Sequence, residues 1–421
     1  MCKENHFLTN LFYAKYYFYA SLFLKLHIMK QAFKITIGFG AIISIFAAMA
    51  YNKKPVKAHI VKQPFLQKNL LQPKIQVAIL LDVSSSMDGL IEQAKTQLWN
   101  MVSTMGKAKC SNDVAPKIEI ALYEYGRTNN DVKRGYVKQI NNFMSDLDSL
   151  SENLFSIKTN GGEEYCGQVI YTSINELQWD ASPENYKVIF IAGNEDFLQG
   201  NLKYTTACNA AKEKGVIVNT IYCGDKMQGV REHWNLGGEC GNGSYTNINQ
   251  NAKDIEIPTP YDSALYVLND KLNSTYISYG AMGYSKKAKQ VQMDYANSTV
   301  SKSAGIKRRT VKGKQGLYKN NDWDLVDAST YNKMAIENLD IKTLPDSLQN
   351  KTRAELKILV AQKSAERNSI QTQIAIASVD REKFIAAEKV KLETGNAAPT
   401  LETEVEKIIK TQAARFNMRI Q

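Results

Sequence analysis

The feature that most constrains the fold is a regular succession of apolar and amphipathic segments between residues 74 and 280. Apolar runs of strand length, such as KIQVAILLD at 74–82 and YKVIFIAG at 186–193, are separated by longer segments whose apolar residues recur at helical spacing. Strands that alternate with helices predict an α/β fold with a doubly wound, mostly parallel sheet of the Rossmann type. Further strands are expected at 117–126, 136–143, 216–224 and 244–248.

The region 281–421 has a different pattern and is predicted to be mainly α-helical. It is rich in Lys, Gln, Ala and Glu, and the segment from RAELKILV to EKVKLE indicates one or two long helices of coiled-coil type. Another helix is expected from about Leu401, with Val405 and Ile408 on one face. These helices could pack on the α/β domain, on each other or on a partner. The densest basic run, KRRTVKGK at 307–314, is expected on a solvated loop or helix face, although it could contact an acidic polymer.

Residues 1–50 have the pattern of a leader, with the true start of the protein at Met29. Two lysines follow Met29, an apolar segment runs from 35 to 46, and Ala-Met-Ala stands at 48–50, as in a secretory signal peptide. The polar segment 51–73 is predicted to be a linker. The chain is therefore expected to be exported, either periplasmic or secreted. The alternative is an uncleaved segment that tethers the chain to a membrane.

Charge and cysteine content exclude several classes of function. The formal charge of +11 falls to +7 without the leader, which holds five Lys and one Glu, and this balance does not by itself indicate nucleic acid binding. The sequence has no CxxC motif and few histidines, which argues against a typical zinc site. Five cysteines follow the leader, so at least one is left without an intramolecular partner. Cys223 and Cys240 close a short loop and are the candidate disulfide.

Three polar clusters are expected at one edge of the sheet, at 82–86, 159–164 and 194–196, because ligands of such sheets bind beyond the carboxyl ends of the strands. The first cluster, in ILLDVSSSMDG, follows a buried strand directly. Oxygen ligands on a tight loop suit a hard divalent cation such as Mg²⁺.

One aspartate and two serines, Asp82, Ser84 and Ser86, would leave such an ion short of negative charge. A carboxylate of another molecule could then complete the coordination shell. In the alternative interpretation, Ser84 and Ser86 cap a helix that starts near Asp88, and nothing is bound.

The apolar strand, the DVSSSM motif, the amphipathic helix after it and the order of the elements resemble the von Willebrand factor A domain, which is also the inserted domain of integrins. The resemblance covers about residues 74–280. It implies a doubly wound fold and a metal-ion-dependent adhesion site, formed in the family by the two serines, a threonine after Gly-Gly, and an aspartate in Thr-Asp-Gly. Here NGGEEY has Glu163 at the threonine position, and IAGNED has Asn194 in place of the aspartate.

The implied metal ligands are therefore Asp82, Ser84, Ser86, Glu163 and Asn194. Mg²⁺ is the expected ion, with Ca²⁺ or Mn²⁺ as alternatives. Because the second and third motifs depart from the family, Glu164, Glu195 or Thr159 could also supply an oxygen. A glutamate ligand would neutralise the ion more fully and weaken its attraction for a partner's carboxylate.

These observations predict an exported, non-enzymatic protein that binds a divalent cation and engages a protein partner through the metal edge. One alternative is a structural envelope protein that acts through its C-terminal helices. Another is a hydrolase that uses the paired carboxylates of Glu163, Glu164, Glu195 and Asp196. No partner identity or oligomeric state follows from the sequence.

Overall fold

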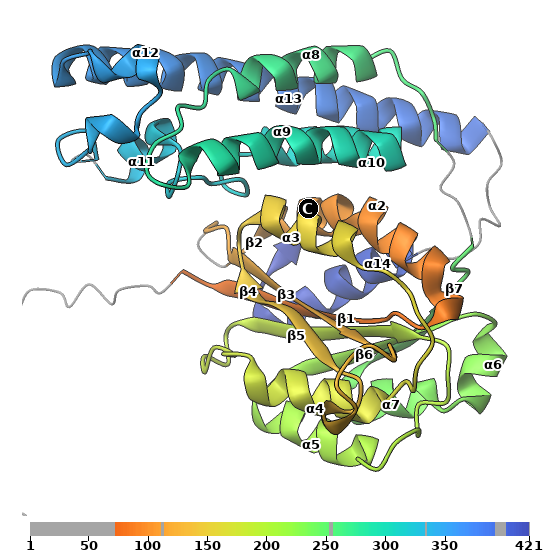
Figure 1. Cartoon of the computed structure of the whole chain (residues 1–421). Helices are drawn as coiled ribbons and strands as arrows, with labels where there is room; N and C mark the ends of the chain where they lie inside the picture. Colours follow the sequence, from red (N-terminus) through yellow and green to blue (C-terminus); the bar gives the residue numbers. More distant parts are fainter. Residues whose placement is uncertain (1–71, 111–112, 252–255, 333–334, 392–400, 421) are drawn as a thin grey trace, which may run out of the picture. The chain divides into compact units, whose positions relative to one another are not determined.

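The computed structural model contains a six-stranded sheet with the spatial order β4-β3-β1-β5-β6-β7 (Figure 1). It describes residues 72–110, 113–251, 256–332, 335–391 and 401–420. The strands are β1 (Lys74–Asp82), β3 (Lys117–Tyr125), β4 (Lys138–Met144), β5 (Tyr186–Gly193), β6 (Ile217–Cys223) and β7 (Asn242–Ile248). β4 is antiparallel to β3, and the other neighbouring pairs are parallel. The predicted doubly wound, mostly parallel sheet is confirmed.

Helices cover both faces of this sheet (Figure 1). Successive residues of β1 alternate between the two faces, so that Val77 and Leu81 enter one apolar core whereas Ala78 and Leu80 enter the other. The first face carries α2 (Asp88–Met105), α3 (Leu147–Ser156) and α14 (Leu401–Ala413). The second carries α4 (Cys166–Glu176), α5 (Tyr204–Glu213), α6 (Lys226–Arg231) and α7 (Trp234–Cys240).

The strand order reverses between β1 and β5. The chain first builds outward from β1 through β3 to β4 and then returns to place β5 on the other side of β1. In a doubly wound sheet, the loops at such a switch point leave a crevice beyond the carboxyl ends of the strands, and ligands bind there. Since Leu81 pairs with Ala192, the loops that follow Asp82 and Gly193 begin side by side at this point.

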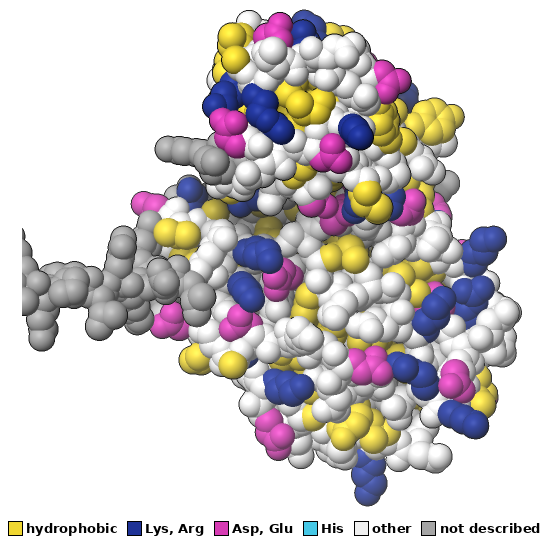
Figure 2. All heavy atoms as spheres, turned by 60° about the vertical axis from the view of Figure 1, so that its left-hand side comes forward, with side chains coloured by type: hydrophobic (Ala, Val, Ile, Leu, Met, Phe, Trp, Pro, Cys, Tyr) yellow, Lys and Arg dark blue, Asp and Glu magenta, His cyan; other side chains and the backbone are white. Residues whose placement is uncertain are grey.

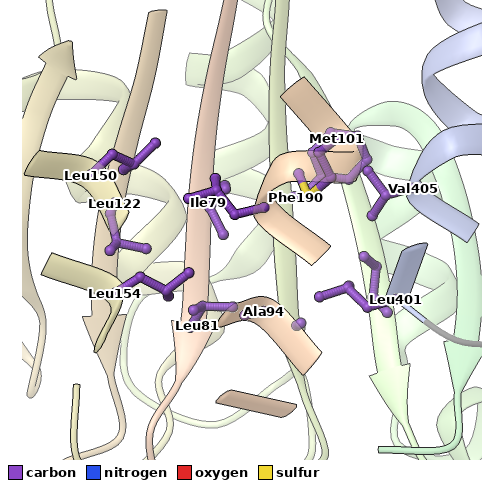
Figure 3. A pocket seen from close by; sticks show the side chains of 13 residues that line it. Ile79, Leu81, Ala94, Met101, Leu122, Leu150, Leu154, Phe190, Leu401 and Val405 are labelled. Atoms are coloured by element: carbon purple, nitrogen blue, oxygen red, sulfur yellow. The ribbon is translucent and has the colours of Figure 1, made fainter. Parts of the chain in front are cut away.

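Helix α14 belongs to the core of the α/β layer, although it lies far along the chain from the strands. Its Leu401 and Val405 line an apolar cavity of about 20 Å³ together with Met101 of α2 and side chains of β1 and β5 (Figure 3). Gln412 hydrogen-bonds with Asn219 of β6 and accepts from Tyr186 of β5. The short strands β2 (Ala108–Lys109) and β8 (Arg419–Ile420) pair just beyond it. The helix expected from Leu401 therefore exists and packs on the sheet.

A layer of helices lies over α2 and α3, on the side away from the sheet (Figure 1). Its main members are α8 (Asp262–Asn273), α9 (Gly283–Val300), α10 (Lys302–Lys312) and the long α13 (Arg353–Lys391), with α11 (Leu325–Tyr331) and α12 (Asp346–Gln349) at one end. The predicted helical C-terminal region is thus confirmed. Single turns of 3₁₀ helix are η1 (Ser85–Met87), η2 (Val132–Arg134), η3 (Ile341–Thr343) and η4 (Ala414–Phe416).

Buried charges join the helical layer to the α/β layer. Arg308 of α10 is fully buried, and its guanidinium donates to Asp148 of α3 and to Asp294 of α9, both at 2.6 Å. Lys312 lies 2.7 Å from Asp294, and Arg308 stacks 4.7 Å from the ring centroid of Trp99 in α2. Burial favours the neutral form of Asp294, but Lys312 and Arg308 override it and hold the pKa of this carboxyl well below its usual value.

The expectation of a solvated basic run at 307–314 is therefore wrong. Two cations of this run are matched by two carboxylates inside the interface, which makes their burial tolerable. The solvent-facing surface has basic and acidic side chains intermixed, without a large field of one sign on the face shown in Figure 2.

The predicted leader, 1–50, and nearly all of the predicted linker, 51–73, lie outside the described residues. Among the helices that the structure describes, none is long and apolar enough to cross a membrane.

Candidate metal site

Asp82 ends the central strand β1, and its side chain is fully buried at the switch point. The backbone N–H of Ser84 donates to Asp82 Oδ1 at 2.8 Å, which tightens the loop into a turn closed by the aspartate side chain. The other carboxylate oxygen, Oδ2, is buried without a hydrogen-bond partner among the described residues. Burial raises the pKa of Asp82 to about 7, although Ser84 and the nearby backbone N–H of Asn194 favour the ionised form.

The serine hydroxyls of the motif face each other rather than the helix that follows. Ser84 Oγ lies 3.3 Å from Ser86 Oγ, and Ser86 Oγ donates at 3.4 Å to Asn194 Oδ1. Ser84 occupies the N-cap of η1, but its side chain makes no capping hydrogen bond. Met87, not a serine, precedes α2. The alternative in which the serines only cap the helix is thus not what the geometry indicates.

A second carboxylate, from Glu164, lies near Asp82. Between them is Gly126, with φ of +80°, where an added Cβ would lie 2.8 Å from both Asp82 Oδ1 and Glu164 Cγ. Burial, together with repulsion from Asp82, raises the pKa of Glu164 to about 8. Glu163, the residue at the family's threonine position, has its side chain exposed to solvent. Consecutive residues of this non-helical segment point in different directions, so only one glutamate of the pair enters the site.

The loop after β5 supplies the third part of the site. Asn194 is half-buried beside Ser86, whereas Glu195 is exposed. Gly193 allows the close approach of β5, because a Cβ there would lie 3.0 Å from Asp82 Oδ2 and 2.5 Å from Tyr125 Oη. Thr159 is engaged elsewhere, since its hydroxyl donates to the carboxylate of Asp88.

The residues brought together fit a hard cation. Among the residues that the structure describes, no group of three or more His, Cys, Asp or Glu could hold a metal ion. The switch point instead gathers a mixed set of oxygen donors, from Asp82, Ser84, Ser86, Asn194 and Glu164. Carboxylate, hydroxyl and amide oxygens are donors that Mg²⁺, Ca²⁺ and Mn²⁺ accept. The unpartnered Asp82 Oδ2 is the kind of buried oxygen that a cation would satisfy.

The predicted cysteine pair is not joined in this structure, where Cys223 and Cys240 are both free thiols. Cys223 is buried at the end of β6. Burial raises the pKa of its thiol, and the charge of the nearby Asp82 raises it further. Cys240 ends α7 and is half-buried.

No protein-family model matches the sequence, and no curated protein does. Similar solved structures include a von Willebrand factor type A protein from Catenulispora acidiphila, at 12% identity and TM-score 0.32 over 42% of this chain and 39% of that one. The SpRpn10 VWA domain matches at 13% identity and TM-score 0.32, over 42% of this chain and 88% of that domain. Proximal thread matrix protein 1 from the mussel byssus, described in one structure with a zinc-occupied MIDAS motif, matches at 14% identity and TM-score 0.31, over 42% of each chain.

The matches span less than half of the byssus protein and of the Catenulispora protein. These TM-scores are low, and the doubly wound fold of this chain is shown by its own strand order and helix placement. The described part of the chain is a doubly wound α/β domain with a helical layer, and the solved structures that it resembles include von Willebrand factor A domains.

Proposed function

We propose that the switch point binds one divalent cation, with Mg²⁺ as the best fit, and that the protein engages a protein partner through this site. The proposed protein ligands are Asp82, Ser84, Ser86, Asn194 and Glu164. The observation that carries the proposal is Asp82 Oδ2, a buried carboxylate oxygen without a hydrogen-bond partner among the described residues, in an aspartate that has a second buried carboxylate, Glu164, nearby. An unpaired buried charge is costly, and a cation would offset that cost.

The role of each residue follows from its place. Ser84 N–H fixes Asp82 Oδ1 and thereby leaves Oδ2 for the ion. The two serine hydroxyls and Asn194 Oδ1 would supply neutral oxygens at the solvent side, since Ser86 is exposed and Asn194 is half-buried. When bound, the cation would supply a Lewis-acidic centre that attracts an oxygen of the partner.

Glu164, and not Glu163, is the glutamate that the geometry favours as a ligand. With Asp82 and Glu164 both ionised, two negative charges match a divalent cation fully. The partner's contribution would then be a neutral oxygen, such as a backbone carbonyl or a hydroxyl, more readily than a carboxylate. Export, suggested by the leader pattern, would make this partner a component of the cell envelope or the exterior.

Calorimetric titration of the chain from Tyr51 onward with Mg²⁺, Mn²⁺ and Ca²⁺ tests the proposal. Binding should be lost in Asp82→Asn and weakened at least about tenfold in Glu164→Gln, which removes one charged ligand. Glu163→Gln is the matched control, because the same chemical change at the exposed neighbour should leave binding as in the parent. Absence of heat for all three ions in the parent, or a loss in Glu163→Gln alone, would contradict the assignment.

A hydrolase is the second candidate, because Asp82 and Glu164 lie near each other and have pKa values raised to about 7 and about 8, as in acid–base pairs. Complete burial of Asp82 beneath the serine loop argues for cation binding instead, since a general acid or base must reach its substrate. Turnover of envelope polymers that is lost in Glu164→Gln but retained in Glu163→Gln would support the hydrolase.

A further inference from the structure

Two cysteines from different helices are neighbours on the sheet face that carries α5 and α7. Cys208 lies in α5, and its fully buried thiol is close enough to Cys240, the last residue of α7, for Cys240 to raise the pKa of Cys208 further, beyond the effect of burial. Cys208 Sγ also donates, at 3.9 Å, to the carbonyl oxygen of Gly237, which lies one turn before Cys240 in the same helix. The side chain of Cys208 therefore lies at the last turn of α7, the turn that ends with Cys240.

Helix α7 is held in place by contacts that do not involve its thiol. A Cβ added at Gly237 would lie 2.4 Å from ring atoms of Phe197, and one at Gly241 would lie 2.4 Å from Val218 Cβ. The last turn is closed by a hydrogen bond of 2.9 Å from Gly241 N–H to the Gly237 carbonyl. Because the backbone of α7 is packed this closely, its last turn, which carries Cys240, is held next to Cys208 of α5.

The remaining thiols of the described residues lack such a neighbour. Cys166 has its sulfur 3.8 Å from the hydroxyl of Tyr125, and Cys223 is buried at the end of β6. Cys110 is half-buried and packs against the apolar core that also contains side chains of α2. A disulfide requires that the two Cβ atoms approach within about 4.5 Å, so a neighbouring thiol is the condition that selects a candidate pair.

We propose that Cys208 and Cys240 form a disulfide when the chain meets a small-molecule disulfide as oxidant. Cys240 reacts first, because it is half-buried whereas Cys208 is fully buried. Its thiolate attacks one sulfur of the oxidant, forms a mixed disulfide and releases one thiol. Cys208 then loses its proton and attacks Cys240 Sγ, which forms the internal bond and releases the second thiol. Two protein thiols are oxidised, and the oxidant disulfide is reduced to two thiols.

The bond would brace the loop that follows β5. Trp234 at the start of α7 donates from Nε1 to the carbonyl of Glu195 at 2.7 Å, and Phe197 N–H donates to the carbonyl of Glu232 at 2.9 Å. The loop is thus already attached to the entry of α7, and a bond at the far end of α7 would tie that helix to α5. This inference does not depend on cation binding.

The test is incubation of the purified chain with oxidised glutathione, followed by unfolding, alkylation of the remaining thiols and mass spectrometry of unreduced peptides. A peptide that joins Cys208 to Cys240 and disappears on reduction is expected, and it should persist in Cys223→Ser. Cys110, half-buried without a thiol neighbour, is the internal control and should be recovered alkylated or as the glutathione adduct. Alkylation of both Cys208 and Cys240 in the oxidised sample, or a peptide joining Cys240 to Cys223, would overturn the proposal.

Discussion

Replacement of Arg308 by Met should destabilise the chain strongly, because it removes a cation from a buried charge cluster with almost no exposure to water. Arg308 is fully buried and makes hydrogen bonds of 2.6 Å to Asp148, 2.6 Å to Asp294 and 2.9 Å to the carbonyl of Gln290. Met fills much of the same volume, so the change leaves two carboxylates facing one remaining cation, Lys312. Breaking a buried pair from one side costs about 3–5 kcal/mol.

Urea unfolding followed by circular dichroism is the appropriate assay, since urea does not screen charge. In thermal unfolding, the same loss of free energy of unfolding corresponds to a fall in Tm of roughly 6–10 °C, taking about 2 °C per kcal/mol for a unit of this size. The double variant Arg308→Met with Asp148→Asn balances the charges again and should recover about 1 kcal/mol or more. Lys383→Met, at a largely exposed ion pair, should leave the midpoint unchanged. The reasoning fails if Arg308→Met loses less than about 1 kcal/mol, or if Asp148→Asn lowers stability further in its background.

In calorimetric titrations, Gly193→Ala should bind the cation more weakly, because the added Cβ would lie 3.0 Å from Asp82 Oδ2. The control Gly316→Ala, whose Cβ would have no atom within 4 Å, should bind as the parent does. Val405→Ala should cost about 2 kcal/mol in urea unfolding, since Val405 is fully buried, and Val390→Ala, 79% exposed, should cost almost nothing. The pKa of Asp294 is lower in the folded chain than in the unfolded chain, so the ionised carboxylate stabilises the fold above about pH 4, and this stabilisation is lost progressively as the pH falls further. Urea midpoints that stay unchanged between pH 5 and 2 would contradict this.

The alternation of apolar runs was sufficient to predict the sheet, because strands buried on both faces leave a clear pattern in the sequence. The strand expected at 136–143 exists as β4, Lys138–Met144, and the strand expected at 216–224 exists as β6, Ile217–Cys223. The antiparallel direction of β4 and the pairing of β2 with β8 could not be predicted, since pairing partners leave no local signal in strands this short.

Within the site, the sequence predicted which loops meet but not which side chains enter. Glu163 and Glu164 are the same residue type at adjacent positions, and only the backbone direction after Gly162 decides that Glu164 is buried beside Asp82. The buried role of Arg308 was hidden for a similar reason. A basic run on a helix is typical of a solvated face, and the matching carboxylates, Asp148 and Asp294, come from two other helices.

The return of α14 to the sheet has a consequence for biogenesis. Every strand of the central sheet is synthesised before residue 249, yet the face that receives Leu401 and Val405 stays open until α14 has emerged from the ribosome. The helical layer, made in between, cannot substitute for it, because that layer rests on α2 and α3. A nascent chain of this design keeps an uncovered apolar surface while the whole helical layer is synthesised, which favours binding by chaperones during that interval.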